Sequence, residues 1–349
     1  MPNPNLEWET SEQTDIGLDL GFFNGQLNFT VDYYIKTTKG LLLDAPIPGI
    51  VGNNAPTVNG GSVENRGIEL SLNYQKSIND LNLSAGINFA YNKNEVTEIN
   101  NAEGVLVGAG FSTYGAVSRA QVGFPIAYFW GFKTNGLFQT QQEVESYVNN
   151  DGQLIQPNAA PGDIRFVDVN QDGQINDADR TLIGNPTPDW TFGANFAADW
   201  KGFDLSIFLQ GALGNDIFNG TRRHDLPTAN MSTRFLNRWT GPGTSNEVPR
   251  LTITDPNGNF SKVSDFYIED GSYMRIKDLQ LGYSLPTKVT ELLHIQRARF
   301  FVAANNLVTL TRYRGFDPEI GAASSLSIGI DRGIYPQART YRLGASITF

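Results

Sequence analysis

The stretch QTDIGLDLGFFNGQLNFTVDYYIKTT, Gln13 to Thr38, decides the fold, because apolar residues alternate with polar or small ones through most of its length. The alternating apolar residues are Ile16, Leu18, Leu20 and Phe22 before Asn24-Gly25, and Leu27, Phe29, Val31, Tyr33 and Ile35 after it. A repeat of two residues is that of a β-strand with two different faces. An Asn-Gly pair between two such runs favours the positive φ angles of a tight hairpin turn. The stretch therefore predicts two long antiparallel strands.

The same alternation recurs along the rest of the chain. Seven more strands are predicted, at Gly67–Tyr74, Leu81–Tyr91, Trp190–Trp200, Phe203–Leu209, Ser272–Ser284, Arg297–Leu310 and Thr340–Phe349. Short turns at Asn79-Asp80 and Lys201-Gly202 join two of the pairs, and a short helical stretch, Lys288–His294, joins a third. The sequence therefore predicts an all-β fold with nine main strands.

Composition narrows the class of protein. A net charge of −10 argues against a nucleic-acid partner, because phosphate binding needs a concentrated basic surface. The one dense basic cluster, Arg222-Arg223-His224, is too small for that role. The chain has no cysteine, which excludes disulfides and thiolate chemistry, and no run of eighteen apolar residues, so no transmembrane helix is predicted. A membrane β-barrel would not be detected by that last criterion.

Strand length and aromatic placement favour a membrane barrel. Most of the predicted strands run to roughly 9 to 13 residues, enough to cross a bilayer at a tilt, whereas ordinary strands average about five or six. Aromatic residues lie near strand ends, as an interfacial girdle requires: Tyr33, Tyr74, Tyr91, Trp190, Trp200, Phe203, Tyr283 and Phe349. The opposite face would line a wet lumen with Asp15, Asp19, Asp32, Glu69, Asn73, Asn195, Asp199 and Asp204. The alternative is an ordinary antiparallel sheet with one buried face.

Connection lengths set the sidedness. Short turns alternate with long connections, as in barrels with short periplasmic turns and long outer loops; the long ones are about Lys39–Glu64, Lys93–Pro188, Gly214–Gly271 and Thr311–Ala338. On this reading residues 94–187 form a large extracellular subdomain, and Ala127–Phe138 is local β structure inside it. A pair of extra membrane strands there would fit the alternation equally well. Because bacterial barrels use even strand numbers, nine strands predict the C-terminal part of a larger barrel.

Several motifs together carry a resemblance to a known family. They include VENRGIELSLNY (Val63–Tyr74), VGFPIAYFWGFKTNGLFQT (Val122–Thr140), GSYMRIKDLQLGYSLP (Gly271–Pro286) and NNLVTLTRYRGFDPE (Asn305–Glu319). In this order, and over nearly the whole chain, the sequence resembles the C-terminal half of SusC/RagA-type TonB-dependent outer-membrane transporters of Bacteroidetes.

The resemblance implies a function and its partners. Such a transporter is a barrel of about 22 strands with an N-terminal plug, embedded in outer-membrane lipid and driven by TonB. A SusD-like surface lipoprotein acts as a lid and captures the glycan or peptide that is imported. The nine strands would be the last nine of the barrel. The chain as given lacks the plug and the earlier strands, so import by this chain alone is not expected.

One loop has the spacing of a calcium site. In VDVNQDGQINDADR (Val167–Arg180), EF-hand numbering of residues 168–179 assigns oxygen ligands to Asp168, Asn170, Asp172, the Gln174 carbonyl, Asn176 and Asp179, with Gly173 at the sharp turn. Asp179 is shorter than the usual final Glu, and flanking helices are not evident. The loop is therefore predicted to bind Ca²⁺ as a structural ion, or else to be an Asn/Asp-rich turn cluster that needs no ion.

Enzyme chemistry is not predicted. The two histidines, His224 and His294, fall in separate predicted connections, so a histidine triad or metal site has little to build on. The acidic pairs Glu143 with Glu145 and Asp317 with Glu319 are interpreted as solvated or loop-capping groups. Outer-loop aromatic residues, Tyr114, Phe129, Trp130 and Trp239, are expected to pack rather than to stack on sugars. A different reading of the whole chain is a calcium-stabilised surface β protein for adhesion or glycan binding.

Overall fold

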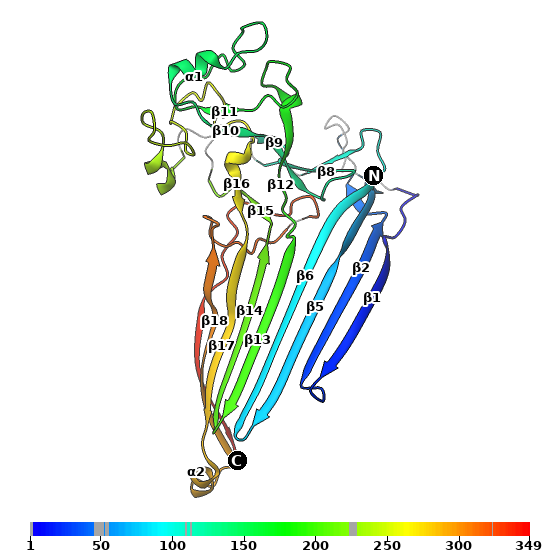
Figure 1. Ribbon diagram of the computed structural model, residues 1–349, viewed down its shortest axis with the longest axis vertical. Helices are drawn as coiled ribbons and strands as arrows, with labels where there is room; N and C mark the ends of the chain where they lie inside the picture. The colour runs from blue at the N-terminus through cyan, green and yellow to red at the C-terminus, as the bar shows by residue number, and fades with distance from the viewer. Residues whose placement is uncertain are drawn as a thin grey trace.

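A nine-stranded antiparallel sheet organises the chain (Figure 1). The computed structural model describes residues 3–44, 52, 56–108, 110–111, 114–222, 229–322 and 324–349. In spatial order the strands are β1 (Thr10–Phe22), β2 (Leu27–Lys39), β5 (Gly61–Ile78), β6 (Leu81–Ile99), β13 (Trp190–Trp200), β14 (Phe203–Leu213), β17 (Tyr273–Ser284), β18 (Arg297–Thr311) and β20 (Thr340–Thr348). These are the nine predicted strands, and each pairs with the next in chain order.

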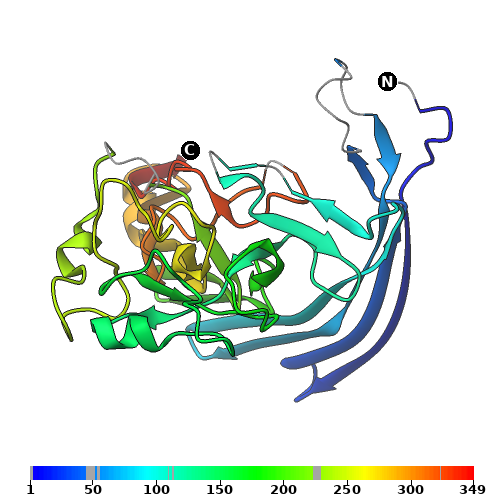
Figure 2. The same cartoon turned by 90° about the horizontal axis from the view of Figure 1, so that it is seen from above.

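The sheet is open and curved (Figure 2), with β1 and β20 at its two ends. Its outward face is apolar and strongly exposed: Ile16 is 70% exposed, Tyr341 68% and Leu343 85%. An apolar surface that spans a whole sheet is too large for a protein surrounded by water, and it matches the lipid-facing wall of a membrane barrel. The opposite face carries the polar residues.

Of the short turns at the lower end, Lys201-Gly202 agrees with its sequence signal and the turn of the first hairpin differs from it. Trp200 pairs with Phe203, so Lys201 (φ 49°) and Gly202 (φ 89°) form a two-residue turn in which both angles are positive. At the first hairpin Phe22 pairs with Leu27 instead, so the turn is longer than a two-residue Asn-Gly turn. Phe23 joins Asn24 and Gly25 at positive φ, which the sequence pattern did not indicate.

Strands β5 and β6 extend further than predicted, to 18 and 19 residues. Their added residues pair with each other from Gly61↔Ile99 onward, apart from one register shift. Here Val63 and Val96 are buried against Leu106 and Ala120 of the outer loops. Both faces of the sheet are in part covered at this end, so the simple alternation that marks the membrane-spanning part is lost.

A layer of small sheets and loops lies at the end of the sheet opposite the short turns (Figure 1). One sheet has the order β12-β9-β8-β7, with β12 at Arg180–Gly184, β9 at Tyr128–Phe132, β8 at Ser118–Gln121 and β7 at Val105–Val107. Another joins β10 (Thr134–Leu137) to β11 (Ile164–Phe166), and a third joins β16 (Ile268–Asp270), β15 (Asp216–Asn219) and β19 (Ile330–Asp331). Strands β3 (Leu42–Asp44) and β4 (Thr57–Asn59) form a fourth, and α1 spans Gln141–Ser146.

This outer layer has its own aromatic core. Phe129, Phe166 and Phe218 are fully buried, and Tyr114, Phe235, Tyr267 and Ile330 join the same cluster. The cluster therefore contains residues from three long connections. These are residues 94–187, the connection between β14 and β17, and the connection between β18 and β20. Strands β9 and β10 arise from Ala127–Phe138 and lie in small sheets, so within the described residues this segment adds no strand to the nine-stranded sheet.

The connection between β17 and β18 lies at the other end, close to the C-terminus (Figure 1). It contains helix α2 (Thr287–Leu292), one residue earlier at its start than predicted and two at its end. Among the described residues, no helix has the length and apolar character needed to cross a membrane.

Candidate functional site

The polar face of the large sheet is the first candidate site. Directly opposed residues of antiparallel strands share a face, and the register opposes Asp32 to Glu69 and Asp199 to Asp204. Asn73 and Asn195 both oppose Gly86, which has no side chain to separate them. With Asp15 and Asp19 of β1, the predicted lumen-facing residues therefore lie on one face of the sheet.

A groove of about 520 Å³ crosses this face. Its polar lining comes from six neighbouring strands and comprises Asp32, Glu69, Ser71, Asn88, Thr191, Gln210 and Tyr273. Because polar groups here face open space rather than a packed core, this face can hydrogen-bond to a hydrated solute. Asp32 and Glu69 make this side of the wall acidic.

The far side of the wall is charge-compensated. Arg299 of β18 donates to both oxygens of Asp204 at 2.9 and 2.5 Å. Arg275 of β17 lies higher up and is almost completely buried, with only 2% of its surface exposed. Arg275 could not be identified from the sequence, because one arginine in an alternating strand carries no signal until its partners are known.

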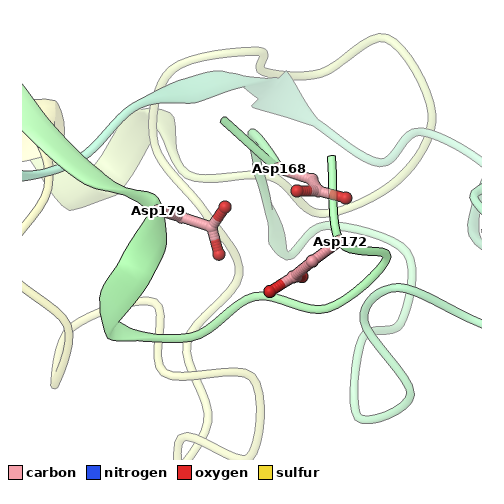
Figure 3. A group of neighbouring side chains, drawn as sticks. All are labelled: Asp168, Asp172 and Asp179. Atoms are coloured by element: carbon pink, nitrogen blue, oxygen red, sulfur yellow. The ribbon is translucent and has the colours of Figure 1, made fainter. Parts of the chain in front are cut away.

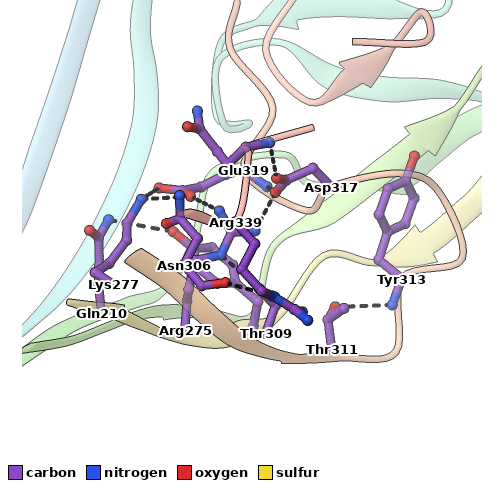
Figure 4. Close-up of polar contacts among 12 residues, drawn as sticks. Gln210, Arg275, Lys277, Asn306, Thr309, Thr311, Tyr313, Asp317, Glu319 and Arg339 are labelled. Carbon is purple, nitrogen blue, oxygen red and sulfur yellow. Dashed lines mark hydrogen bonds and ion pairs between the residues drawn. The ribbon is translucent and has the colours of Figure 1, made fainter. Parts of the chain in front are cut away.

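The carboxylate partners of Arg275 come from the last outer loop, and a third partner, Thr309, lies on β18 (Figure 4). Its guanidinium donates to Asp317 Oδ1 at 2.6 Å, to Glu319, and to Thr309 Oγ1 at 2.8 Å, while Lys277 Nζ lies 2.7 and 2.8 Å from the two Glu319 oxygens. Asp317-Pro318-Glu319 is therefore engaged in a buried ion-pair network that ties the loop to β17. Of the two readings given for this pair, loop-capping agrees with the structure and solvated does not, because Asp317 is buried.

Asp317 is held ionised by that network. Burial on its own raises the pKa of this carboxyl, but hydrogen bonds from Arg275 and from the backbone N–H groups of Gln337 and Glu319 outweigh it. The pKa of Asp317 therefore lies below its ordinary value. The anchor is built to persist at neutral and mildly acidic pH.

The second candidate site is the acidic loop of residues 168–179 (Figure 3). Carboxylate oxygens of Asp168, Asp172 and Asp179 lie within 4.8 Å of one another. The backbone N–H of Gly173 donates to Asp168 Oδ2 at 2.8 Å, while Asp168 Oδ1 is buried without a hydrogen-bond partner in the described part of the chain. Gly173 has φ 85°, the left-handed conformation that the sharp turn requires, and Ile175 packs against the aromatic core.

The other residues of the loop bond to one another. Asp179 is fully buried and accepts the backbone N–H groups of Val169 at 2.8 Å and Asn176 at 2.9 Å. The amide groups of Asn170 and Asn176 each donate to Asp172 Oδ2 at 3.0 Å and lower the pKa of Asp172. The side chain of Gln174 is exposed to solvent. Hydrogen bonds of this kind also occur in a turn cluster that holds no ion. Among the described residues, they leave one oxygen of the three carboxylates, Asp168 Oδ1, buried and without a hydrogen bond.

The remaining acidic and histidine residues offer little chemistry. Glu143 Oε2 accepts the backbone N–H of Gln139 at 2.7 Å beside α1, and Glu145 accepts a hydrogen bond from Gln141 at 3.1 Å. His294 follows α2, and His224 lies outside the described residues. Tyr114 and Phe129 are buried in the outer core, and Trp239 packs partly buried against it. Phe129 lies below 1% exposure, so packing accounts for it.

Comparisons with known proteins agree with the geometry of the sheet. The family described as "TonB dependent receptor-like, beta-barrel" matches residues 1–307. The chain is 33% identical over 357 aligned residues to TonB-dependent receptor P3 of Formosa agariphila, an alignment that covers 99% of the chain and 35% of that protein. It is 29% identical to TonB-dependent receptor SusC of Bacteroides thetaiotaomicron, over 99% of the chain and 32% of that protein.

Among solved structures, the chain superposes on the RagAB peptide transporter with a TM-score of 0.77 at 28% identity. The match covers 99% of the chain and 36% of the matched chain. The chain therefore spans about a third of the length of the relatives that it matches.

Proposed function

The chain belongs to the family of TonB-dependent receptor-like β-barrels, and from that premise we propose that it forms part of the wall of a nutrient importer. Its place is the outer membrane, as in its SusC and RagA relatives. The observation that carries the proposal is the division of the nine-stranded sheet into an exposed apolar face and a polar face with an open groove. Lipid covers the first face, and solute passes along the second.

The proposed cargo is a glycan or a peptide. One relative is named SusC, and a solved relative is described as a peptide transporter. The proposed partners are a SusD-like surface lipoprotein, which delivers cargo at the outer layer, and TonB, which supplies energy from the inner membrane. The acidic and amide groups of the polar face fit cargo with many hydrogen-bond donors, which both classes have.

Uptake by intact cells tests the importer proposal. Cells that carry the full transporter, and cells that lack it, are given a fluorescent short peptide or a fluorescent oligosaccharide, and retained fluorescence is measured with and without TonB. We expect uptake of one cargo class that depends on both the transporter and TonB. Equal uptake in the strains with and without the transporter would contradict the proposal.

We propose in addition that residues 168–179 bind Ca²⁺ as a structural ion. The support is the buried, unpartnered Asp168 Oδ1 beside two further carboxylates, since hard oxygen ligands are what this cation needs. The ion would be bound by Asp168, Asp172 and Asp179. Asp179 also closes the loop, because it accepts hydrogen bonds from backbone N–H groups within it. Affinity on the order of 10⁻⁴ to 10⁻³ M suffices in an extracellular module.

Limited proteolysis tests the calcium proposal. Cleavage within residues 94–187 of the detergent-solubilised protein is compared in millimolar calcium and in excess chelator. We expect calcium to slow cleavage several-fold, and Asp168→Ala to remove the effect without unfolding the barrel. The matched control is Asp177→Ala, because Asp177 is exposed, lies 3.4 Å from Arg180 and is not in the ligand set. Identical digestion with calcium and with chelator would show that the loop is only a turn.

A further inference from the structure

A second cavity, of about 720 Å³, lies in the outer layer beside β15 and β16. Its charged lining is formed by the three arginines Arg222, Arg234 and Arg314 and, among the described residues, by one carboxylate, Glu269. Positive charge therefore exceeds negative charge by two on its described walls. Its size is typical of a cavity that holds a small molecule or one residue of a polymer.

Glu269 is already committed to its neighbours. It is 7% exposed; Oε1 accepts from Asn219 Nδ2 at 3.1 Å and lies 3.3 Å from Arg314 Nε, and Oε2 accepts the Arg314 backbone N–H at 2.9 Å. Both carboxylate oxygens of Glu269 are therefore already in contact with Asn219 or Arg314. Arg314 is held in place by these contacts while half of its side chain stays exposed.

Within the described part of the chain, Arg234 lacks a carboxylate partner of this kind. It belongs to the short 3₁₀ helix η4 (Thr233–Asn237), and its guanidinium carbon lies 4.5 Å from the centre of the Phe266 ring. Its Nε is buried and makes no hydrogen bond within the described residues. Burial, and next the charge of Arg314, lower the pKa of Arg234, and the charges of Glu269 and Glu247 offset this only in part. Leaving a guanidinium desolvated beside another cation is unfavourable unless an anion completes the arrangement.

The cavity lies close to the polar wall. Gly315 and Phe316 line it, and they also line a smaller polar cavity whose other walls include Arg275 and Thr309. A solute at Arg234 is therefore one loop segment away from the polar face of the sheet. Arg234 also lines a further cavity, whose carboxylates are Glu247 and Asp265. Asp265 already accepts hydrogen bonds from Thr134 at 2.6 and 3.0 Å.

We propose that this cavity binds a carboxylate group of the imported cargo, held by the guanidinium groups of Arg234 and Arg314. The planar fork of arginine matches the two oxygens of a carboxylate. Phe266, Tyr267 and Phe316 supply apolar and aromatic surface for the part of the cargo next to the charge. The inference rests on the proposed import function, and it narrows the cargo to anionic glycans or to peptides with a free carboxylate.

Protection of arginine against phenylglyoxal tests the site directly. The full transporter is treated with this arginine-specific reagent in acetate, or in chloride at equal ionic strength, and each modified arginine is located by peptide mass spectrometry. We expect acetate to slow modification of Arg234 and Arg314 at least threefold, on the order of what a weak charged pair gives. Arg66, whose side chain is 45% exposed on β5, is the internal control. Equal rates in acetate and chloride, or equal protection of Arg66, would overturn the proposal.

Matched cargo distinguishes the source of the carboxylate. A short peptide is compared with its C-terminal amide, and a uronic-acid oligosaccharide with its carboxyl-reduced form, as competitors of the same modification. We expect the charged member of one pair to protect Arg234 at about tenfold lower concentration than its neutral counterpart. If Arg234 were protected only after the partner lipoprotein is added, the cavity would be a docking surface for that lipoprotein, and the proposal would be overturned.

Variants separate this site from import in general. Arg234→Gln is expected to weaken uptake of the charged cargo about tenfold relative to the neutral form, and Arg234→Lys to restore it in part. Arg66→Gln is the matched control. If no cargo is taken up in a TonB-dependent way while acetate still protects Arg234, the importer proposal fails and the anion site stands. If uptake is normal and Arg234→Gln affects charged and neutral cargo alike, the anion site fails.

Discussion

Arg275 and Asp317 illustrate what a single buried charge requires. Replacing Asp317 with Asn leaves the Arg275 guanidinium with one carboxylate fewer and weakens the acceptor of two backbone N–H groups. Breaking a buried pair in this way costs about 3 kcal/mol. We expect Asp317→Asn to release residues 312–339 from β17, seen as faster amide hydrogen exchange in that loop.

An exposed pair provides the control for Asp317→Asn. Lys39 and Glu12 lie 2.8 Å apart with side chains 49% and 68% exposed. Glu12→Gln is therefore expected to change stability by less than about 1 kcal/mol. Similar effects of both substitutions on their local hydrogen exchange would contradict the anchoring role of Asp317.

Acid should release the same anchor only at low pH. Because the pKa of Asp317 is depressed in the folded protein, its contribution to stability is complete above the unfolded value of about 3.9 and is lost as pH falls through the folded value. We expect exchange protection of residues 312–339, corrected for the intrinsic rate, to be constant from about pH 7 to 5 and to collapse below about pH 4. Loss of protection near pH 6 would show that another group controls the loop.

Sequence reasoning reached only part of this chemistry. The spacing of Asp168, Asp172 and Asp179 predicted that their carboxylates would meet, because a loop of fixed length with a glycine turn brings such positions together. Arg234 and Arg275 could not be found that way. The carboxylates that pair with Arg275, and the second arginine beside Arg234, lie far along the chain, and a grouping set by tertiary packing leaves no local pattern.

Turns are the elements at which backbone conformation is most restrictive. Gly202 has φ 89°, and a Cβ added there would lie 2.7 Å from the Ser284 carbonyl oxygen. Gly25 has φ 83°, but a Cβ there would meet no atom of the described residues within 4 Å. Both Gly→Ala changes carry the left-handed strain of about 1–2 kcal/mol, and only Gly202→Ala adds the collision. We expect Gly202→Ala to lower the free energy of unfolding in detergent by clearly more than Gly25→Ala; equal losses would mean that the neighbouring strand yields.

Elements with a simple environment were the most predictable from sequence. All nine strands of the large sheet were predicted, since lipid on one side and water on the other impose a period of two. The ends of β5 and β6 were not, because Val63 and Val96 lie where the outer layer covers the sheet. The length of the first turn depended on Phe23, a residue type that rarely adopts positive φ.

At the scale of the whole molecule, two solvents shape two parts of one chain. The large sheet presents its apolar residues outward, whereas the outer layer buries Phe129, Phe166 and Phe218 in a core of the kind found in soluble proteins. That core gathers residues from three connections without a helical or strand period, so its membership could not be read from the sequence. Two properties of the sheet could be read from the sequence. The alternation of apolar and polar residues indicates which face is apolar, and loop length indicates which end carries the long connections.

This division gives a sharp test at two adjacent positions of β6. Ile87 is 51% exposed on the apolar face, and Asn88 lines the groove on the polar face. In a membrane wall, arginine at the lipid-facing position costs about 2–4 kcal/mol near the bilayer midplane, whereas a lumen-facing arginine remains in water. We therefore expect Ile87→Arg to lower the unfolding free energy in lipid vesicles by that amount and Asn88→Arg to change it little. In a soluble sheet an exposed Ile87 would accept arginine as readily as Asn88 does, so equal tolerance at both positions would rule out lipid as the solvent of the apolar face.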